Sequence, residues 1–163
     1  MQVLDASSII YAWDNYPESQ FPPLWKWLAR QISEQQLMIP KVAFDEVEGK
    51  SPECAQWLRA QHIELLPMTE AILKDALRIK HLVGVVGEKY HPKGVGENDL
   101  MIIATARAHG GELLTDEERQ PALPKESTKR KIPAVCDMDG VSWRPQPCLR
   151  FVEYVKRSQE VFG

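Results

Sequence analysis

The sequence predicts an α/β fold with a central parallel sheet, and three observations support this prediction. Short apolar runs that suit buried strands alternate with longer segments of helical periodicity. Such alternation is typical of crossover units, in which a helix connects two parallel strands. Hydrophobic residues make up 44% of the 163 residues, and no repeat or Gly/Ser-rich linker divides the chain. We therefore predict one domain over residues 1–163.

Four short apolar runs are the main strand candidates. In chain order they are Met1–Leu4, Leu37–Ile39, Ile63–Leu66 and Leu113–Leu114. Two further runs, at Ala134–Val135 and Val141–Trp143, are weaker candidates. We therefore expect a sheet of four to five strands.

The segments between and after these runs carry helical patterns with recognisable start signals, such as a Ser or Thr cap or a Pro in the first turn. Seven helices are expected. The first follows Asp5, with Ser7 or Ser8 as cap, and the second begins at Pro22-Pro23. The third runs from Pro40 to Gly49, the fourth begins at Ser51-Pro52-Glu53, and the fifth begins at Thr69-Glu70. The last two run from Asn98 to His109 and from Cys148 to Lys156. The segments 84–97 and 117–131 are expected to be loops.

Charge and cysteine usage exclude several classes of protein. Twenty Lys and Arg against 23 Asp and Glu give a net charge of −3, which excludes a protein held to nucleic acid by bulk positive charge. The three cysteines are odd in number and form no Cys-x-x-Cys pair, so neither a disulfide framework nor a zinc site is indicated. No apolar stretch reaches the roughly 18–20 residues of a membrane span. The first residues lack a signal-peptide pattern, so we expect a cytoplasmic protein without membrane contact.

Acidic residues lie close to the predicted strand ends. Asp5 directly follows the first strand, and Asp116-Glu117 closely follow the fourth. Asp99 is expected in the first turn of the helix before the fourth strand, and Glu46 on the helix after the second. Taken singly, each has a structural explanation as a turn, a cap or a solvated side chain. Together they should meet at one edge of a parallel sheet, where crowded carboxylates raise each other's pKa and Mg²⁺ or Mn²⁺ relieves the repulsion.

Four segments, in order and spacing, resemble the motifs of PIN-domain ribonucleases. They are Met1–Ile10 with Asp-x-Ser, Ile39–Val47 with Pro-x-Val before a Glu, Gly96–Ala106 with Asp-x-x-Ile-x-Ala-x-Ala, and Leu113–Glu117 with Leu-x-Thr-x-acid. The resemblance spans residues 1 to about 145. The stretches 94–99 and 131–136 are most similar to a small, little-characterised PIN subgroup that is itself similar to VapC-type toxins of toxin–antitoxin systems.

This resemblance implies a three-layer α/β/α PIN-like fold and a Mg²⁺- or Mn²⁺-dependent endoribonuclease that hydrolyses single-stranded RNA. It also implies the role of toxin in a type II toxin–antitoxin pair, a cognate antitoxin as partner, and frequent homodimerisation. Asp5, Glu46 and Asp99 would correspond to catalytic acids. Strict Thr-x-acid spacing selects Glu117 as the fourth, with Asp116 as the alternative if the loop twists differently. The metal ligands would be Asp5, Asp99 and either Glu117 or Asp116.

Two polar neighbours complete the site that the resemblance implies. Ser7 would position Asp5 or a water on the metal, and Asn98 would support Asp99. A helix-capping role is the alternative for both Ser7 and Asn98.

The best candidate for RNA-phosphate contact is the basic loop around Lys129, Arg130 and Lys131, with a solvated loop as the alternative. A second function class also stays open, namely a PIN-like interaction module with weak or no catalysis.

Overall fold

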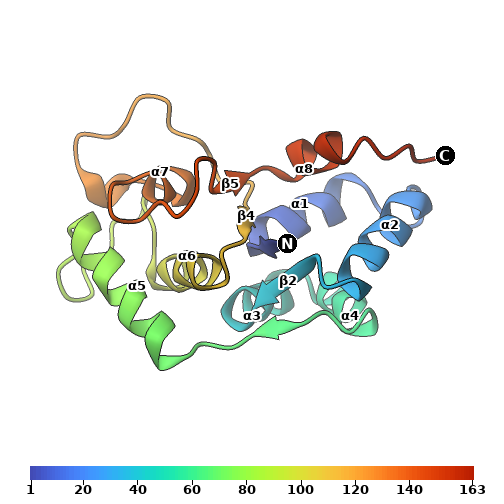
Figure 1. Ribbon diagram of the computed structural model, residues 1–163, viewed down its shortest axis with the longest axis horizontal. Coiled ribbons are helices and arrows are strands. Elements are labelled where there is room, and N and C mark those ends of the chain that lie inside the picture. Colours follow the sequence, from blue (N-terminus) through green and yellow to red (C-terminus); the bar gives the residue numbers. More distant parts are fainter.

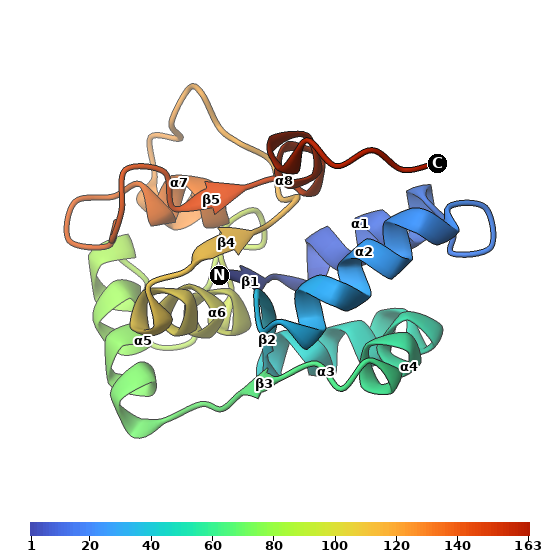
Figure 2. The same cartoon turned by 45° about the vertical axis from the view of Figure 1, so that its right-hand side comes forward.

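A computed structural model describes residues 1–163 and confirms the α/β class, with helices on both sides of one sheet (Figures 1 and 2). All neighbouring strands are parallel, and their order is β3-β2-β1-β4-β5. The strands are β1 (Gln2–Leu4), β2 (Leu37–Pro40), β3 (Leu65–Leu66), β4 (Glu112–Leu114) and β5 (Cys148–Leu149). The helices are α1 (Ala6–Asn15), α2 (Pro22–Ser33), α3 (Lys41–Lys50), α4 (Pro52–Ala60), α5 (Glu70–Val83), α6 (Glu97–His109), α7 (Ile132–Cys136) and α8 (Phe151–Ser158).

The first strand is the middle of the sheet. Gln2 is in register with Leu37 of β2 on one side and with Glu112 of β4 on the other. Val3 and Leu4 are fully buried, as expected for a parallel strand covered on both faces. The residue after β1 therefore emerges at the centre of the sheet's carboxyl edge.

The fifth strand differs from both weaker candidates. Ala134–Val135 lies inside α7, whose Pro133 suits a first helical turn, and Val141–Trp143 forms no strand. The strand is instead Cys148–Leu149, which the sequence pattern had assigned to the last helix. Pro147 precedes it, and its carbonyl accepts from the Leu113 amide at 2.8 Å. A two-residue strand is too short to produce a periodic signal.

Two helix signals were wrong, whereas the expected start of α5 is confirmed. The N-cap of α1 is Asp5 rather than a serine, and the Ser8 hydroxyl donates back to the Asp5 carbonyl at 2.8 Å. Gly49 lies within α3, which ends at Lys50. Thr69 does cap α5, because its hydroxyl accepts from the Ile72 amide at 3.2 Å.

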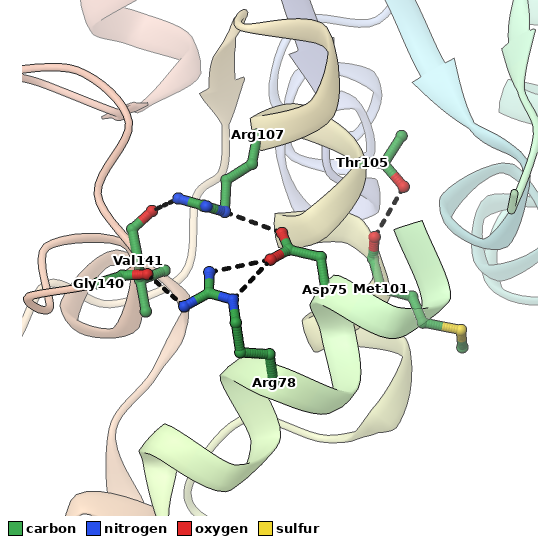
Figure 3. Close-up of polar contacts among 7 residues, drawn as sticks. All are labelled: Asp75, Arg78, Met101, Thr105, Arg107, Gly140 and Val141. Carbon is green, nitrogen blue, oxygen red and sulfur yellow. Dashed lines mark hydrogen bonds and ion pairs between the residues drawn. The ribbon is translucent and has the colours of Figure 1, made fainter. Parts of the chain in front are cut away.

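A charged network fastens α5 to α6 and to the segment after α7 (Figure 3). The Asp75 carboxylate accepts from the Nε atoms of Arg78 and Arg107, each at 2.9 Å. Arg78 also donates to the Gly140 carbonyl at 2.7 Å, and Arg107 donates to the Val141 carbonyl. The carboxyl-terminal half of α6 is thus held in place, which fixes the direction of the helix that carries Asp99.

None of the helices has the length and apolar character that crossing a membrane requires.

Candidate functional site

A cavity of about 860 Å³ is lined by the side chains that the sequence analysis singled out. They come from the ends of β1 and β4 and from α3 and α6, which converge at the carboxyl edge of the sheet. The acidic members are Asp5, Asp14, Glu46, Asp99, Asp116 and Glu117. Asp14, on α1, was not among the predicted residues. We call this space the acidic cavity.

Asp5 lies at the bottom of the acidic cavity and is 3% exposed. Its Oδ2 accepts hydrogen bonds from the hydroxyls of Ser7, at 2.5 Å, and Thr115, at 2.9 Å. The Ser7 hydroxyl accepts in turn from the Asp116 amide at 2.9 Å. Burial raises the pKa of Asp5, and the two hydroxyl donors oppose that rise. Ser7 therefore ties Asp5 to the end of β4, and it does not cap the helix.

Glu46 projects from α3 and is half-buried. Burial and the charge of Asp5 raise its pKa, whereas a hydrogen bond with the Asn98 side chain lowers it. Asn98 was expected to support Asp99 or to cap the helix. Gly96, and not Asn98, caps α6, and the Asn98 side chain acts on Glu46 by lowering its pKa.

Asp99 is the third residue of α6, and its Oδ2 accepts from the Gly96 amide at 2.9 Å. Its Oδ1 accepts no hydrogen bond from the chain. Burial raises the pKa of Asp99 to about 6, and the charges of Asp5 and Glu46 add to the rise. A carboxylate with an unpartnered oxygen and acidic neighbours is a suitable ligand for a hard cation.

Asp116 and Glu117 both contact the start of a helix. Asp116 Oδ1 accepts from the Phe151 amide at 2.9 Å, and Glu117 Oε2 accepts from the Ile132 amide at 3.1 Å. Burial raises both pKa values, that of Glu117 to about 7. The charge of Asp99 contributes to the rise at Glu117, whereas Asp5 is the cavity acid that acts on Asp116.

Two lysines line the acidic cavity without forming an ion pair. Lys50 lowers the pKa of Glu46 and Asp99, and Lys131 lowers that of Glu117. Lys50 was not predicted, although its spacing of four residues from Glu46 on one helix was a usable signal.

The other two residues of the basic loop lie elsewhere. Lys129 pairs with Glu126 at 3.7 Å, and Arg130 lines a different cavity. Of the three basic residues, Lys131 alone lines the acidic cavity.

The carboxylate oxygens of the acidic cavity suit a hard cation such as Mg²⁺, but they do not form a closed coordination sphere. No three His, Cys, Asp or Glu side chains are already arranged to hold a metal ion. Mg²⁺ retains several waters and commonly takes only one or two protein carboxylates. The acidic cavity therefore matches a hydrated Mg²⁺ or Mn²⁺ better than an ion enclosed by protein ligands.

The comparison with known families assigns the chain. Residues 2–162 match a family described as a domain of unknown function, DUF4411, and the protein belongs to that family. No curated protein matches the sequence.

The raised pKa values predict how stability depends on pH. The folded protein keeps protons on Asp99 and Glu117 up to about pH 6 and 7, whereas the unfolded chain loses them near its ordinary values of 3.8 and 4.5. Stability from these groups is thus full below about pH 4 and is lost as the pH rises to 7. Without metal, Asp99→Asn and Glu117→Gln should each be more stable than wild type by roughly 1–3 kcal/mol at pH 8 and show little gain at pH 4.

Urea unfolding in chelator at a series of pH values measures this effect. The difference between variant and wild type is the relevant quantity, because Glu112, whose pKa Arg157 lowers by a hydrogen bond, gives the whole protein an opposite slope. Parallel profiles for variant and wild type would contradict the assignment.

One wall of the acidic cavity depends on a close backbone approach. A Cβ added at Gly94 would lie 1.8 Å from the Thr128 carbonyl oxygen, a backbone atom that cannot rotate away. Gly94→Ala should therefore lower the free energy of unfolding by about 3 kcal/mol. Gly49→Ala is the matched control, because nothing lies within 4 Å of the added atom. That helical substitution should stabilise the protein by roughly 0.5–1 kcal/mol. Equal effects in urea unfolding would argue against the close approach.

Proposed function

We propose that this protein is a Mg²⁺- or Mn²⁺-dependent endoribonuclease that hydrolyses phosphodiester bonds of single-stranded RNA. The observation that supports this most strongly is the convergence of carboxylates from five elements of the fold on one cavity with two unpaired lysines. Crowded, half-buried acids are destabilising by themselves, and a divalent cation offsets that cost. Acids that would bind a divalent cation, next to lysines that would attract a phosphate, suit phosphodiester hydrolysis.

The residues divide into those that would hold a cation and those that position them. Asp5, Asp99 and Glu117 would be ligands, with Glu46 as a fourth ligand or as an orienting group. When bound, the cation would activate water and stabilise charge on the phosphate. The hydroxyls of Ser7 and Thr115 donate to Asp5 and orient its carboxylate, and Asn98 would orient Glu46. Lys50 and Lys131 would attract the phosphate and reduce its repulsion from the acids.

The motif resemblance also supports a role as the toxin of a type II toxin–antitoxin pair, acting in the cytoplasm. An antitoxin protein would then be its partner, and a homodimer its working form. Induced expression in bacteria should arrest growth, and the Asp99→Asn variant should not. Normal growth with active, folded wild-type protein would remove the toxin role and leave the nuclease in place.

The nuclease itself is tested with purified protein and two RNAs, one structured and one unstructured. We expect cleavage of the unstructured RNA with Mn²⁺ or Mg²⁺ and none in chelator. Glu118→Gln is the matched control for Glu117→Gln, because Glu118 is exposed and outside the acidic cavity. Cleavage that persists in chelator would contradict a metal-dependent mechanism.

A second candidate function is a PIN-like interaction module with weak or no catalysis. The lack of a preformed group of three ligands favours it. Metal-independent RNA binding without cleavage in Mn²⁺ would select this alternative.

A further inference from the structure

Consecutive residues of the basic loop line two different cavities. Lys131 lines the acidic cavity, and Arg130 lines a second cavity of about 570 Å³. The second cavity also contains Arg119, and Asp137 is its single acidic residue. Four prolines, which carry no amide donor, form part of its wall: Pro121, Pro133, Pro145 and Pro147. The hydrogen-bond donors of this cavity are therefore mainly side chains. We call this space the arginine cavity.

Arg130 has no partner for its charge. Its guanidinium forms no ion pair, although the acidic residue Asp137 lines the same cavity. Its Nε is shielded from solvent and has no hydrogen-bond acceptor in the chain. A buried N–H without an acceptor costs free energy, so no group of the chain compensates this guanidinium. The unpaired charge of Arg130 at the cavity wall is therefore available to an anion.

Arg119 and the adjoining chain are already fixed. The two Nη atoms of Arg119 donate to Glu153 at 3.2 and 2.6 Å, which leaves three of its five N–H groups free. The Gln120 side chain donates to the Lys129 carbonyl at 3.2 Å and accepts from the Lys131 amide at 2.9 Å. These bonds hold the backbone on both sides of Arg130.

We propose that the arginine cavity binds a phosphate group through Arg130 and Arg119. The planar fork of guanidinium donors matches phosphate oxygens, and such charge-assisted hydrogen bonds are strong. A free phosphate and a phosphate of a polynucleotide backbone offer the same chemistry. Binding of a backbone phosphate rests on the proposed function. One RNA strand would then contact Lys131 in the acidic cavity and Arg130 in the arginine cavity.

The test measures binding in chelator, where no metal-dependent cleavage takes place. Inorganic phosphate and a short oligouridylate are titrated into wild type, Arg130→Gln and the matched control Arg30→Gln. Arg30 is exposed and pairs with Glu160 away from both cavities. Arg130→Gln should weaken binding about tenfold or more, and Arg30→Gln should leave it unchanged. Asp137→Asn should strengthen binding, because it removes a negative charge from the lining.

The outcomes separate the two sources. An Arg130-dependent affinity for phosphate supports a site for free phosphate, and an Arg130-dependent affinity for oligouridylate alone supports a backbone contact. Equal binding of both probes to Arg130→Gln and Arg30→Gln would overturn the proposal. If Arg130→Gln does not fold, the Nε–H resonances of Arg119 and Arg130 in wild type are followed during both titrations, and unmoved resonances would overturn it equally. Phosphate binding with no RNA cleavage in Mn²⁺ would refute only the nuclease.

Discussion

Replacing Asp99 by Asn is expected to reduce metal-dependent RNA cleavage by about a thousandfold or more. The substitution preserves the shape of the side chain and an oxygen that can accept from the Gly96 amide, so the start of α6 should remain intact. It removes the negative charge that a divalent cation requires from this ligand. Initial rates with a fluorescent unstructured RNA, at saturating Mn²⁺, measure the loss.

The same variant distinguishes a lost ligand from a lost fold. Losing an acid from a first helical turn costs only about 0.3–1 kcal/mol, and relief of repulsion from Asp5 and Glu46 acts in the opposite direction. Its melting temperature in chelator should thus equal or exceed that of wild type, whereas the increase on adding Mn²⁺ should shrink. Glu97→Gln, an exposed acid in the same turn, is the control and should keep both properties. Retained cleavage in a folded Asp99→Asn protein would refute the catalytic assignment.

Glu117→Gln should reduce cleavage by about a hundredfold or more, and Asp116→Asn by less than about tenfold. The charge of Asp99 acts on Glu117, which indicates that these two carboxylates could share one ion. Asp116, like Glu117, accepts from the first amide of a helix, a role that an Asn oxygen can also fill, but Asp99 is not among the charges that shift its pKa.

The ranking of these two variants is informative because each keeps its backbone contact, with Ile132 or with Phe151. Comparing both in one assay removes differences in RNA preparation and metal content. The reverse ranking would show that Asp116 is the fourth acid of the site.

Most of the fold follows from local signals in the sequence. Long helices with clear start signals, such as α2 after Pro22 and α5 after Thr69, lie where the pattern predicts them. All acids that line the acidic cavity except Asp14 were also found, because the carboxyl ends of parallel strands meet at one edge. The missed elements are those fixed by tertiary contacts. Cys148–Leu149 becomes a strand only through pairing with β4.

The side-chain partners inside the site were harder to foresee. The Asn98 side chain lowers the pKa of Glu46, which lies on a different helix, α3. Likewise the side chains of Arg130 and Lys131 enter different cavities, which a run of basic letters does not reveal. Such contacts depend on how helices and loops pack, and single-sequence periodicity carries no information about that packing.

The central position of β1 constrains the order in which the chain can acquire its structure during synthesis. β1 is the earliest strand in the chain, yet its partner Glu112 is 110 residues away from Gln2. Until β4 leaves the ribosome, β1 has one open edge with unpaired backbone groups. Loop-closure entropy opposes so distant a pairing, which predicts slow folding after release compared with helical proteins of this length. The nascent chain of this protein therefore exposes the edge of β1, which is open to non-native strand pairing, until β4 has been synthesised.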